Sequence, residues 1–486
     1  MYIYTAENIH KIDEKAEEQG FCLFALMENA GRNIAEALKT KIEKQDDILI
    51  LAGRGNNGGD GIVIARYLQE AGYRVSLHFP FGTPKTDTAK EHLAFYSHYF
   101  TVSKELYSEG EYTVIIDAML GVGSKLPLRE NVRDVIHWAN KQAASRYAVD
   151  LPTGVLADNG TVGMCHSDSD VFRADMTFAL HGAKPSAFLL PSSAFYGELV
   201  PISIGLKQES NMKLTDKNSV KDTFHKRKKS AHKGTFGTSL LLAGSDDMPG
   251  SALLAGIGAI RSGTGRLIIG TSELAASVIA TRVPEATYML GGIKTLNETG
   301  NLPSKISAIG IGPGLQEVTE VDQALDTLMQ TDMPLVVDAG ALLANRAWKR
   351  KAPTILTPHP GEFSRLTGIA IPDIQANRMK VAQDFAIEQD VTLVLKGRHT
   401  VIAFPDGQVS INTTGNTGLA KGGSGDVLTG MITSMLSYYD DYRAAVTNAV
   451  FLHGLCADVW LEANSETTMV ASDFDELLPK VFRMMQ

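Results

Sequence analysis

A glycine-rich segment near the end of the chain carries the first group that could do chemistry. It runs from Gly415 to Gly430 and reads GNTGLAKGGSGDVLTG, with Asp426 directly before an apolar run that predicts a buried helix. Glycines let backbone N–H groups turn toward one point, and a helix N-terminus adds partial positive charge, so this corner favours an anion. A carboxylate beside a bound phosphate suits phosphoryl transfer, in which a hydroxyl must lose its proton. The alternative is that Asp426 only caps the helix.

Four other segments of the second half place distinctive residues after short apolar runs. They are GPGL (Gly312 to Leu315), VVDAG with Asp338, HPGEF (His359 to Phe363) and KGRHT (Lys396 to Thr400). Because the carboxyl ends of parallel strands meet at one edge of a sheet, these segments are expected to lie together. Each alone has a structural explanation, such as a strand-end cap or a histidine in a rigid turn. Their combined placement favours a site.

Two aspartates of the first half also follow apolar runs that predict strands. Asp117 comes after TVII, Asp150 comes after YAV, and the glycine segment GRGNNGGDG (Gly53 to Gly61) follows ILILA. The two carboxylates, with Asn57 and the Thr153 hydroxyl, would form an all-oxygen pocket of the kind that a hard cation prefers. The alternative is that both aspartates cap loops and bind only backbone N–H groups. The polar glycine loop in register with both acids favours a site.

The elements that must position these groups alternate between strand and helix, which predicts an α/β fold with largely parallel sheets in both halves. In the first half we expect helices from Thr5 to Glu18, Leu23 to Lys41, Ile62 to Gly72 and Glu130 to Ala143, and strands at ILILA, YRVSLHF, TVIIDA and YAVDL. In the second half we expect strands at TSLLLAG, AIGIG, PLVVDAG, TILTPH and TLVLKG, and helices that include GSALLAGIGAIR and VLTGMITSMLSYY. The first half is therefore expected to be a Rossmann-like, doubly wound domain.

Length and composition bound the class of protein. The 486 residues are too many for one ordinary core and predict two domains, 1–214 and 215–486, joined through a polar segment from Leu206 to Lys233. A net charge of -9 argues against nucleic acid as a partner. Three distant cysteines indicate a reducing compartment and no disulfide framework. We recognise no signal-peptide pattern and no apolar run of membrane-spanning length, so we expect a cytoplasmic protein that binds no membrane.

GRGNNGGDG, DAMLGVGSKLP and DLPTG, in this order, resemble the signature of the NAD(P)H-hydrate epimerase domain, across nearly the whole first half. The resemblance implies that the two glycine segments hold a hydrated nicotinamide nucleotide. The implied substrate contacts are Asn56, Asn57, Gly58, Gly59, Asp60, Gly121, Val122, Gly123, Ser124, Lys125, Leu126, Pro127 and Asp150. It also implies a potassium ion on Asn57, Asp117 and Thr153, where threonine replaces a common serine, and it makes Asp150 the expected proton shuttle.

GPGL, VVDAG, TPHPGEF, LKGRHTVIA and GGSGDVLTG resemble the ADP- or ATP-dependent NAD(P)H-hydrate dehydratases, which have a ribokinase-like α/β fold. This resemblance covers residues 225–486. The implied contacts to the hydrated cofactor are Ala252, Gly314, His359 and Asp426, and those to the adenine nucleotide are Lys396, Gly397, Arg398, His399, Thr400 and Gly425. The fusion of both domains in one chain is similar to the bifunctional NAD(P)H-hydrate repair enzymes, and relatives of this kind assemble, so we expect a homo-oligomer.

The resemblance implies a reaction for each half. In the second half, Asp426 would deprotonate the C6 hydroxyl of the hydrated ring, which attacks the terminal phosphoryl group of ADP or ATP beside a magnesium ion. Elimination of phosphate then restores the reduced nicotinamide, because phosphate leaves more readily than hydroxide. This reaction takes the S form, and the first half would interconvert the R and S forms.

Two other functions fit part of the sequence. An ordinary small-molecule kinase of the ribokinase superfamily explains GGSGD but leaves NNGGDG and the two strand-end acids without a role. A first half that acts only as a binding or scaffold module is the other alternative. The presence of Asn57, Asp117 and Asp150 argues against it.

Overall fold

The computed structural model describes residues 1–103, 107–162, 170–344 and 346–486 of the chain. The chain forms two compact units: unit 1 is Met1–Met212 with Gln375–Asn377, and unit 2 is Lys213–Ile374 with Arg378–Gln486. The predicted boundary between residues 214 and 215 falls inside strand β8 (Met212–Thr215). That each half folds as an independent domain stays a prediction.

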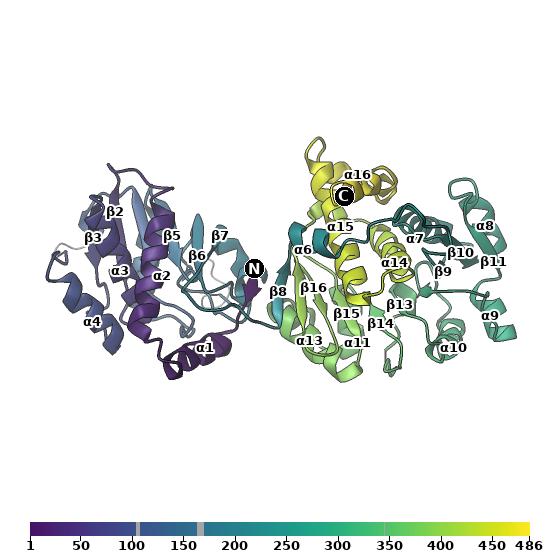
Figure 1. Ribbon diagram of the computed structural model, residues 1–486, viewed down its shortest axis with the longest axis horizontal. Coiled ribbons are helices and arrows are strands. Elements are labelled where there is room, and N and C mark those ends of the chain that lie inside the picture. The colour runs from purple at the N-terminus through teal and green to yellow at the C-terminus, as the bar shows by residue number, and fades with distance from the viewer. Residues whose placement is uncertain (104–106, 163–169, 345) are drawn as a thin grey trace. The chain divides into compact units, whose positions relative to one another are not determined.

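Unit 1 is a parallel α/β sheet (Figure 1). The described strands of this sheet are β2 (Asp47–Ala52), β3 (Arg74–His78), β4 (Val114–Ala118), β5 (Ser145–Val149), β6 (Met176–Leu180) and β7 (Glu198–Ile202), and the two-residue strand β1 (Tyr2–Ile3) is not part of it. Its helices in the same described ranges are α1 (Ala6–Glu18), α2 (Leu23–Leu38), α3 (Asn56–Glu70), α4 (Asp87–Tyr96) and α5 (Glu130–Lys141). The sheet order is β3-β2-β4-β5-β6-β7, and every neighbouring pair is parallel. The Rossmann-like, doubly wound fold is confirmed, although β6 and β7 were not foreseen.

Strand β2 shows why helices cover both faces of this sheet. Ile48, Ile50 and Ala52 belong to one apolar cluster that also includes residues of α2 and α3. Leu49 and Leu51 belong to a second cluster, which includes the apolar face of α5. All five side chains are buried. An apolar run without polar alternation is therefore a strand buried on both faces, as in other parallel sheets.

Helix α3 begins earlier than expected. It starts at Asn56, so NNGGDG forms its first turns, where we expected a loop. The glycines allow close packing there, because a Cβ atom on Gly58 would lie 2.0 Å from the Gly53 carbonyl oxygen, and one on Gly59 would lie 2.4 Å from a methionine sulfur. Gly58 and Gly59 thus bring the start of the helix against its neighbours, which leaves the side chain of Asn57 to face the strand ends.

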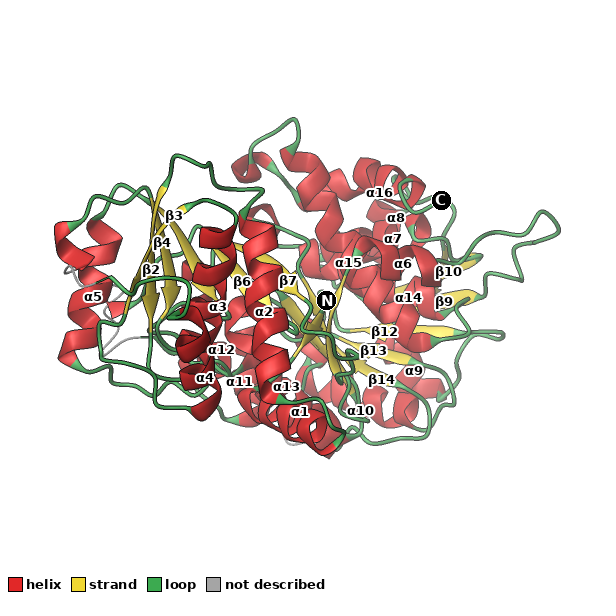
Figure 2. Ribbon diagram, turned by 60° about the vertical axis from the view of Figure 1, so that its left-hand side comes forward, coloured by secondary structure: helices red, strands yellow, loops and turns green. Residues whose placement is uncertain are grey.

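Unit 2 is a larger, mostly parallel α/β sheet (Figure 2). Besides β8, its described strands are β9 (Thr238–Leu242), β10 (Arg266–Thr271), β11 (Thr287–Leu290), β12 (Ala308–Ile311), β13 (Leu335–Val337), β14 (Thr354–Leu356), β15 (Thr392–Leu395), β16 (Thr400–Ala403) and β17 (Val409–Asn412). Part of the strand order of this sheet is β17-β16-β15-β14-β13-β12-β9-β10-β11. Neighbouring strands are parallel from β15 to β11, whereas β16 is antiparallel to both of its neighbours, β15 and β17. All the strands expected in the second half are present.

The helices of the second half begin just after the strands. In the described ranges they are α6 (Lys217–Thr223), α7 (Pro249–Arg261), α8 (Glu273–Ile279), α9 (Ile293–Thr299), α10 (Val318–Met329), α11 (Pro360–Thr367), α12 (Ile371–Ala376), α13 (Arg378–Gln389), α14 (Ser424–Leu436), α15 (Tyr442–Leu461) and α16 (Phe474–Arg483). Strand residues such as Val336, Ile355 and Val394 share an apolar cluster with α14 and α15. Helix α14, whose first turn contains Asp426, therefore packs on the buried apolar core of unit 2.

Helices α7 and α14 pack backbone against backbone. A Cβ atom on Gly258 would lie 2.2 Å from the Val427 carbonyl oxygen, and one on Gly430 would lie 1.9 Å from the Ala255 carbonyl oxygen. The small residues of α7 were expected to admit either a neighbouring element or a ligand, and here they admit α14. The contact brings the first turn of α7 beside the first turn of α14.

Two segments differ from the sequence analysis. The polar stretch Leu206 to Lys233, expected as a connection, contains β8 and α6, and Val220 and Phe224 belong to the unit 2 core. Helix α15 is long and apolar enough to cross a membrane, although we recognised no such run; 61% of its most apolar window is buried in the protein, as in a core helix. Among the cysteines, Cys22 and Cys456 are free thiols, and Cys165 lies outside the described residues.

Candidate active sites

Topology places both candidate sites at the carboxyl ends of the strands. In unit 1, β2 lies between β3 and β4, and in unit 2, β9 lies between β10 and β12. The chain thus leaves each central strand to one side and returns to the other, and the crevice at such a point is where open α/β sheets bind ligands. The residues predicted from sequence follow these strands or begin the helices after them.

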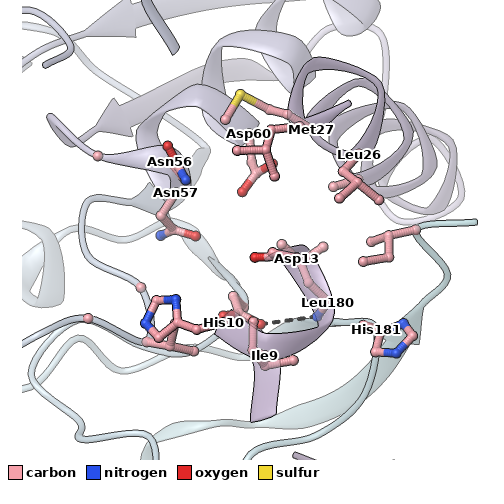
Figure 3. A pocket seen from close by; sticks show the side chains of 18 of the residues that line it. Ile9, His10, Asp13, Leu26, Met27, Asn56, Asn57, Asp60, Leu180 and His181 are labelled. Atoms are coloured by element: carbon pink, nitrogen blue, oxygen red, sulfur yellow. Dashed lines mark hydrogen bonds between the residues drawn. The ribbon is translucent and has the colours of Figure 1, made fainter. Parts of the chain in front are cut away.

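Unit 1 has a cavity of about 400 Å³ at this edge (Figure 3). Of the predicted substrate contacts, Asn56, Asn57, Asp60, Gly121, Val122, Gly123, Ser124 and Asp150 line it. Gly58, Gly59, Lys125, Leu126 and Pro127 are not among the lining residues, and the first two serve packing as described above. The lining also includes Leu26 and Met27 of α2 and Ile204, so a bound ring would meet both apolar and polar side chains.

Asp150 is held in one position by Lys184. It ends β5 in the left-handed region, with φ 70°. The Lys184 ammonium group donates a hydrogen bond to Asp150 Oδ1, and to the carbonyl oxygens of Leu180 at 3.0 Å and Gly182 at 3.2 Å. The Leu180 N–H donates to the same carboxylate oxygen at 3.2 Å. Because Lys184 is almost wholly buried, this is an enclosed ion pair, and both of its residues line the cavity.

Asp60 faces the same cavity without such support. It is 7% exposed, and among the described residues no hydrogen bond to its carboxyl group is found. Burial, and then the negative charges of Asp150 and Asp13, raise the pKa of Asp60 well above its usual range. Figure 3 shows Asp60 from α3 and Asp13 from α1 pointing toward each other across the cavity.

Asp117, Thr153 and Asn57 meet behind the cavity around the backbone of Leu120. Thr153 donates from its hydroxyl to Asp117 Oδ1 at 2.8 Å and from its N–H to Oδ2 at 2.7 Å, and the Met119 N–H donates to Oδ1 at 3.0 Å. The amide nitrogen of Asn57 donates to the Leu120 carbonyl oxygen at 3.0 Å, which leaves its amide oxygen for another partner. Asp117 therefore does more than bind backbone N–H groups, because it also accepts a side-chain hydroxyl.

This oxygen set fits a monovalent cation. Complete burial raises the pKa of Asp117 to about 6, against the effect of its hydrogen bonds, so the carboxylate has no full compensation for its charge. A cation bound there would supply that compensation. In the described ranges no cluster of three or more His, Cys, Asp or Glu side chains gathers as a metal site.

In unit 2, Asp426 stands in the first turn of α14. The residue that caps the helix is Gly423, at φ 92°, and no side chain caps it, so the capping alternative for Asp426 is wrong. Burial raises the pKa of Asp426 to about 6, and the charges of Asp338 and Glu362 add to this, whereas a hydrogen bond with Ser251 of α7 and the charge of Lys396 oppose it. A carboxyl group of this kind is matched to proton transfer near neutral pH.

Lys396 brings a positive charge close to Asp426. Its ammonium nitrogen lies 2.8 Å from Asp338 Oδ1 and 3.9 Å from Glu362 Oε2. Burial alone would lower the pKa of Lys396, but the attraction of both carboxylates outweighs burial and raises it. Asp338 Oδ2 accepts the Thr429 hydroxyl at 2.8 Å, which ties the lysine to α14. Asp338 is thus an anchor for Lys396, and not simply a strand-end cap.

His359 and Gly314 mark the rest of the corner. His359 caps α11. Its ring Nδ1 accepts hydrogen bonds from the backbone N–H groups of Gly361 and Glu362, and its backbone N–H donates to Glu362 Oε2 at 2.8 Å. The outer face of the ring is half exposed. Gly314 has φ 69°, and a Cβ atom there would lie 2.9 Å from Ser251 Cβ, so only glycine fits beside α7. Ala252, in contrast, is wholly buried, and its ligand contact stays a prediction.

A second cavity, of about 560 Å³, lies beside this corner. All of the predicted nucleotide contacts line it: Lys396, Gly397, Arg398, His399, Thr400 and Gly425. Ser424, Asn416 and His453 also line it, and the His453 ring bonds to the Ser424 carbonyl oxygen at 2.9 Å. Burial lowers the pKa of His453 to about 4, so it is neutral and donates this hydrogen bond. The cavity thus reaches the first turn of α14, where Asp426 follows Gly425.

Sequence reasoning missed several residues that the fold brings to these sites. Lys184 was not singled out because the strand before it, β6, was not foreseen. Asp13 lies on an amphipathic helix whose charged residues look solvent-exposed in sequence. His453 sits in the apolar pattern of α15, and its flanking glycine is the one local signal that another backbone passes close by.

Each half of the chain matches its own protein family. A family model described as NAD(P)H-hydrate dehydratase matches residues 239–480, and one described as YjeF-related protein N-terminus matches residues 23–186. The bifunctional NAD(P)H-hydrate repair enzyme Nnr of Moorella thermoacetica is 32% identical over 522 residues, which cover 100% of this chain and 97% of that protein.

Two solved structures resemble unit 2. One is the ADP/ATP-dependent NAD(P)H-hydrate dehydratase from Bacillus subtilis co-crystallized with ATP/Mg²⁺, with 48% identity, a TM-score of 0.55, and coverage of 56% of this chain and 98% of that one. The other, a ribokinase-like superfamily protein from Enterococcus faecalis, has 23% identity and a TM-score of 0.50 over 58% of this chain and 98% of that one, and shows the fold alone.

The fold and the corner at Asp426 define unit 2 as a ribokinase-like nucleotide-binding enzyme, and unit 1 adds a second cavity lined by acids. The chain belongs to the family of bifunctional NAD(P)H-hydrate repair enzymes.

Proposed function

We propose that this chain repairs hydrated NADH and NADPH in two steps. Unit 1 interconverts the R and S forms at C6, and unit 2 dehydrates the S form at the expense of ADP or ATP. The observation that carries this proposal is the presence of two separate cavities, one lined by Asp60 and Asp150 and one that reaches Gly425 next to Asp426, in a chain that is related over its full length to the repair enzymes.

In unit 2 the proposed first step is phosphorylation of the C6 hydroxyl. Asp426 accepts the hydroxyl proton, the hydroxyl oxygen attacks the terminal phosphorus of the nucleotide, and the bond to the leaving phosphate oxygen breaks. Lys396 and the N–H groups at the start of α14 compensate the charge on the phosphoryl group. Phosphate then leaves from C6 as a proton leaves C5, which restores the C5–C6 double bond.

Magnesium fits beside this corner. The ion commonly binds one or two carboxylates together with substrate phosphates, and Asp338 and Glu362 are carboxylates next to Lys396. The relative crystallised with ATP/Mg²⁺ supports ADP or ATP with magnesium as the phosphoryl donor. When bound, the ion would neutralise charge on the phosphates.

In unit 1 we propose potassium on Asn57, Asp117 and Thr153. Two observations support this proposal: all three side chains offer oxygen ligands, and burial raises the pKa of Asp117. A bound cation would compensate the carboxylate charge and lower that pKa. The ion would hold Asp117 and the Leu120 backbone in place beside the cavity. Asp150 exchanges a proton with the substrate as C6 inverts through a ring-opened or iminium species. A cytoplasmic location and a homo-oligomer stay predictions.

Incubation of the purified chain with hydrated NADPH and either nucleotide tests the proposal. We expect inorganic phosphate to be released while the absorbance of reduced nicotinamide returns. A stable phosphorylated product without regained absorbance would identify an ordinary kinase instead. Isolated R hydrate, in the absence of nucleotide, tests unit 1, and a first half that acts only as a scaffold would leave its conversion to the S form at the rate without enzyme.

A further inference from the structure

Three carboxyl groups line the cavity of unit 1, those of Asp13, Asp60 and Asp150, and the last two have opposite surroundings. Asp150 accepts hydrogen bonds from a buried ammonium group and from a backbone N–H. Asp60 is as deeply buried, and among the described residues neither a hydrogen-bond donor nor a cation contacts its carboxyl group. A buried carboxyl group without a partner keeps its proton, because ionisation would leave an uncompensated charge.

The surroundings of Asp60 strengthen this difference. Asp13 from α1 and Asp150 from the end of β5 raise the pKa of Asp60 through their negative charge, whereas Lys184 acts in the opposite direction. His10 and His181 line the same cavity, and burial and Lys184 lower the pKa of His181 to about 4, so this ring is neutral. Two acids whose environments differ in this way are the usual arrangement of a general acid and a general base.

We propose that Asp60 is the proton donor of the epimerisation and that Asp150, held by Lys184, is the proton acceptor. This inference rests on the proposed function of unit 1. It gives Asp60 a catalytic role in addition to the binding role that the sequence implied. It also assigns Lys184 as a positioning residue, since its ammonium group fixes the acceptor and contacts no other polar side chain among the described residues.

The proton transfers balance in a ring-opening route. Asp150 takes the proton of the C6 hydroxyl, the C6–O bond becomes a carbonyl, and the C6–N1 bond breaks with its electron pair on N1. Asp60 protonates N1, whose electron pair is delocalised into the ring carboxamide. Rotation about C5–C6 presents the other face of the aldehyde. N1 then attacks that face and returns its proton to Asp60, while Asp150 returns a proton to the oxygen.

The test uses the full-length chain and purified R hydrate without nucleotide, with chromatographic separation of R and S forms over time. We expect Asp60→Asn to lower the interconversion rate by about 10²–10⁴-fold, as for loss of a general acid. The thermal unfolding profile of the variant, compared with that of wild type, reports whether unit 1 is folded, and dehydration of the S form with nucleotide reports on unit 2. Asp60→Glu, which retains an acid, should recover part of the rate.

The pH profile separates proton donation from simple binding. A donor must be protonated, so the wild-type rate should fall at alkaline pH as Asp60 ionises, and Asp60→Asn should lack this alkaline limb. Asp13→Asn removes a negative charge near Asp60, which favours ionisation, and should therefore move the alkaline limb to lower pH with a much smaller loss of rate. Lys184→Met should reduce the rate without removing the alkaline limb.

Three outcomes would overturn the inference. Asp60→Asn could retain a rate within about threefold of wild type, or it could keep the alkaline limb, or Asp13→Asn could show the large loss instead, which would make Asp13 the donor. A wild-type chain that does not interconvert the hydrates at all would refute the proposed function itself, and that result is distinguishable from the other three.

Discussion

At the scale of single residues, both units use burial to adjust carboxyl groups for proton transfer. Asp426 in unit 2 and Asp60 in unit 1 have raised pKa values mainly because they are buried. Asp150 differs in having the Lys184 ammonium group and the Leu180 N–H as hydrogen-bond partners. The same side-chain type therefore serves as acceptor or donor according to the charge beside it.

We predict that Asp426→Asn lowers the dehydration rate of the S form by about 10²–10⁴-fold while nucleotide binding is retained. An acceptor must be ionised, so in the wild-type chain the rate should fall as pH drops below about 6, the pKa of Asp426, and should level off above it. Steady-state rates from pH 5 to 8, with nucleotide affinity from calorimetry, provide the measurement. Near wild-type turnover in Asp426→Asn would remove this residue from the mechanism.

Asp117→Asn tests the cation site of unit 1. In the wild-type chain, potassium should raise the midpoint of thermal unfolding relative to choline at equal ionic strength, because the ion compensates a buried carboxylate. The variant should lose this response and convert R hydrate slowly, with unchanged dehydration of the S form. Equal stabilisation of wild type and variant by potassium would place the ion elsewhere, and equal loss of both activities would contradict a separate role for unit 1.

At the scale of elements, the contact between α7 and α14 carries the corner of unit 2. We predict that Gly258→Ala lowers the free energy of unfolding by about 1–3 kcal/mol, because the added methyl group would collide with the Val427 backbone. Gly250→Ala on the same helix is the matched control, since a Cβ atom there meets nothing within 4 Å and alanine favours helix. Denaturant unfolding measures the free energy of unfolding of both variants, and equal stability of the two would refute direct backbone packing.

Much of the element order was predictable from sequence, because strands buried on both faces appear as short apolar runs. ILILA and TSLLLAG are examples, and β2 and β9 lie where these runs predicted. Boundaries set by tertiary contacts were not predictable. Helix α3 begins at Asn56 because the glycines of its first turns allow close contact with neighbouring atoms. Helix α6 lies in a polar stretch, where the local signal for a helix is a short capping box at Asp216.

The candidate sites were predictable to the same degree. Residues inside glycine motifs, such as Asn57 and Asp426, were identified because their segments have a distinctive composition. Lys184 and Asp13 were not, since each reaches its cavity from an element whose local sequence looks structural. Their roles depend on which side chains the fold brings opposite them, and spacing along the chain does not contain that information.

At the scale of the whole molecule, two sites on one chain divide one task. Unit 2 has Asp426 next to a cavity that the predicted nucleotide contacts line, which suits the proposed dehydration. Unit 1 has a separate cavity lined by Asp13, Asp60 and Asp150, which suits the proposed inversion of the other isomer. After loss of unit 1, S hydrate should therefore still be repaired, whereas R hydrate should be repaired only as fast as it converts to the S form without enzyme.

The most direct measurement follows reduced-nicotinamide absorbance after nucleotide is added to the full-length chain with pure R hydrate. We predict that the wild-type chain restores the full absorbance expected from the R hydrate supplied, well ahead of the conversion without enzyme. With Asp117→Asn the same hydrate should recover slowly, although S hydrate is repaired at the normal rate. If wild type repairs R hydrate no faster than the uncatalysed conversion to the S form, unit 1 is not an epimerase and the account of the chain as a two-step repair enzyme is wrong.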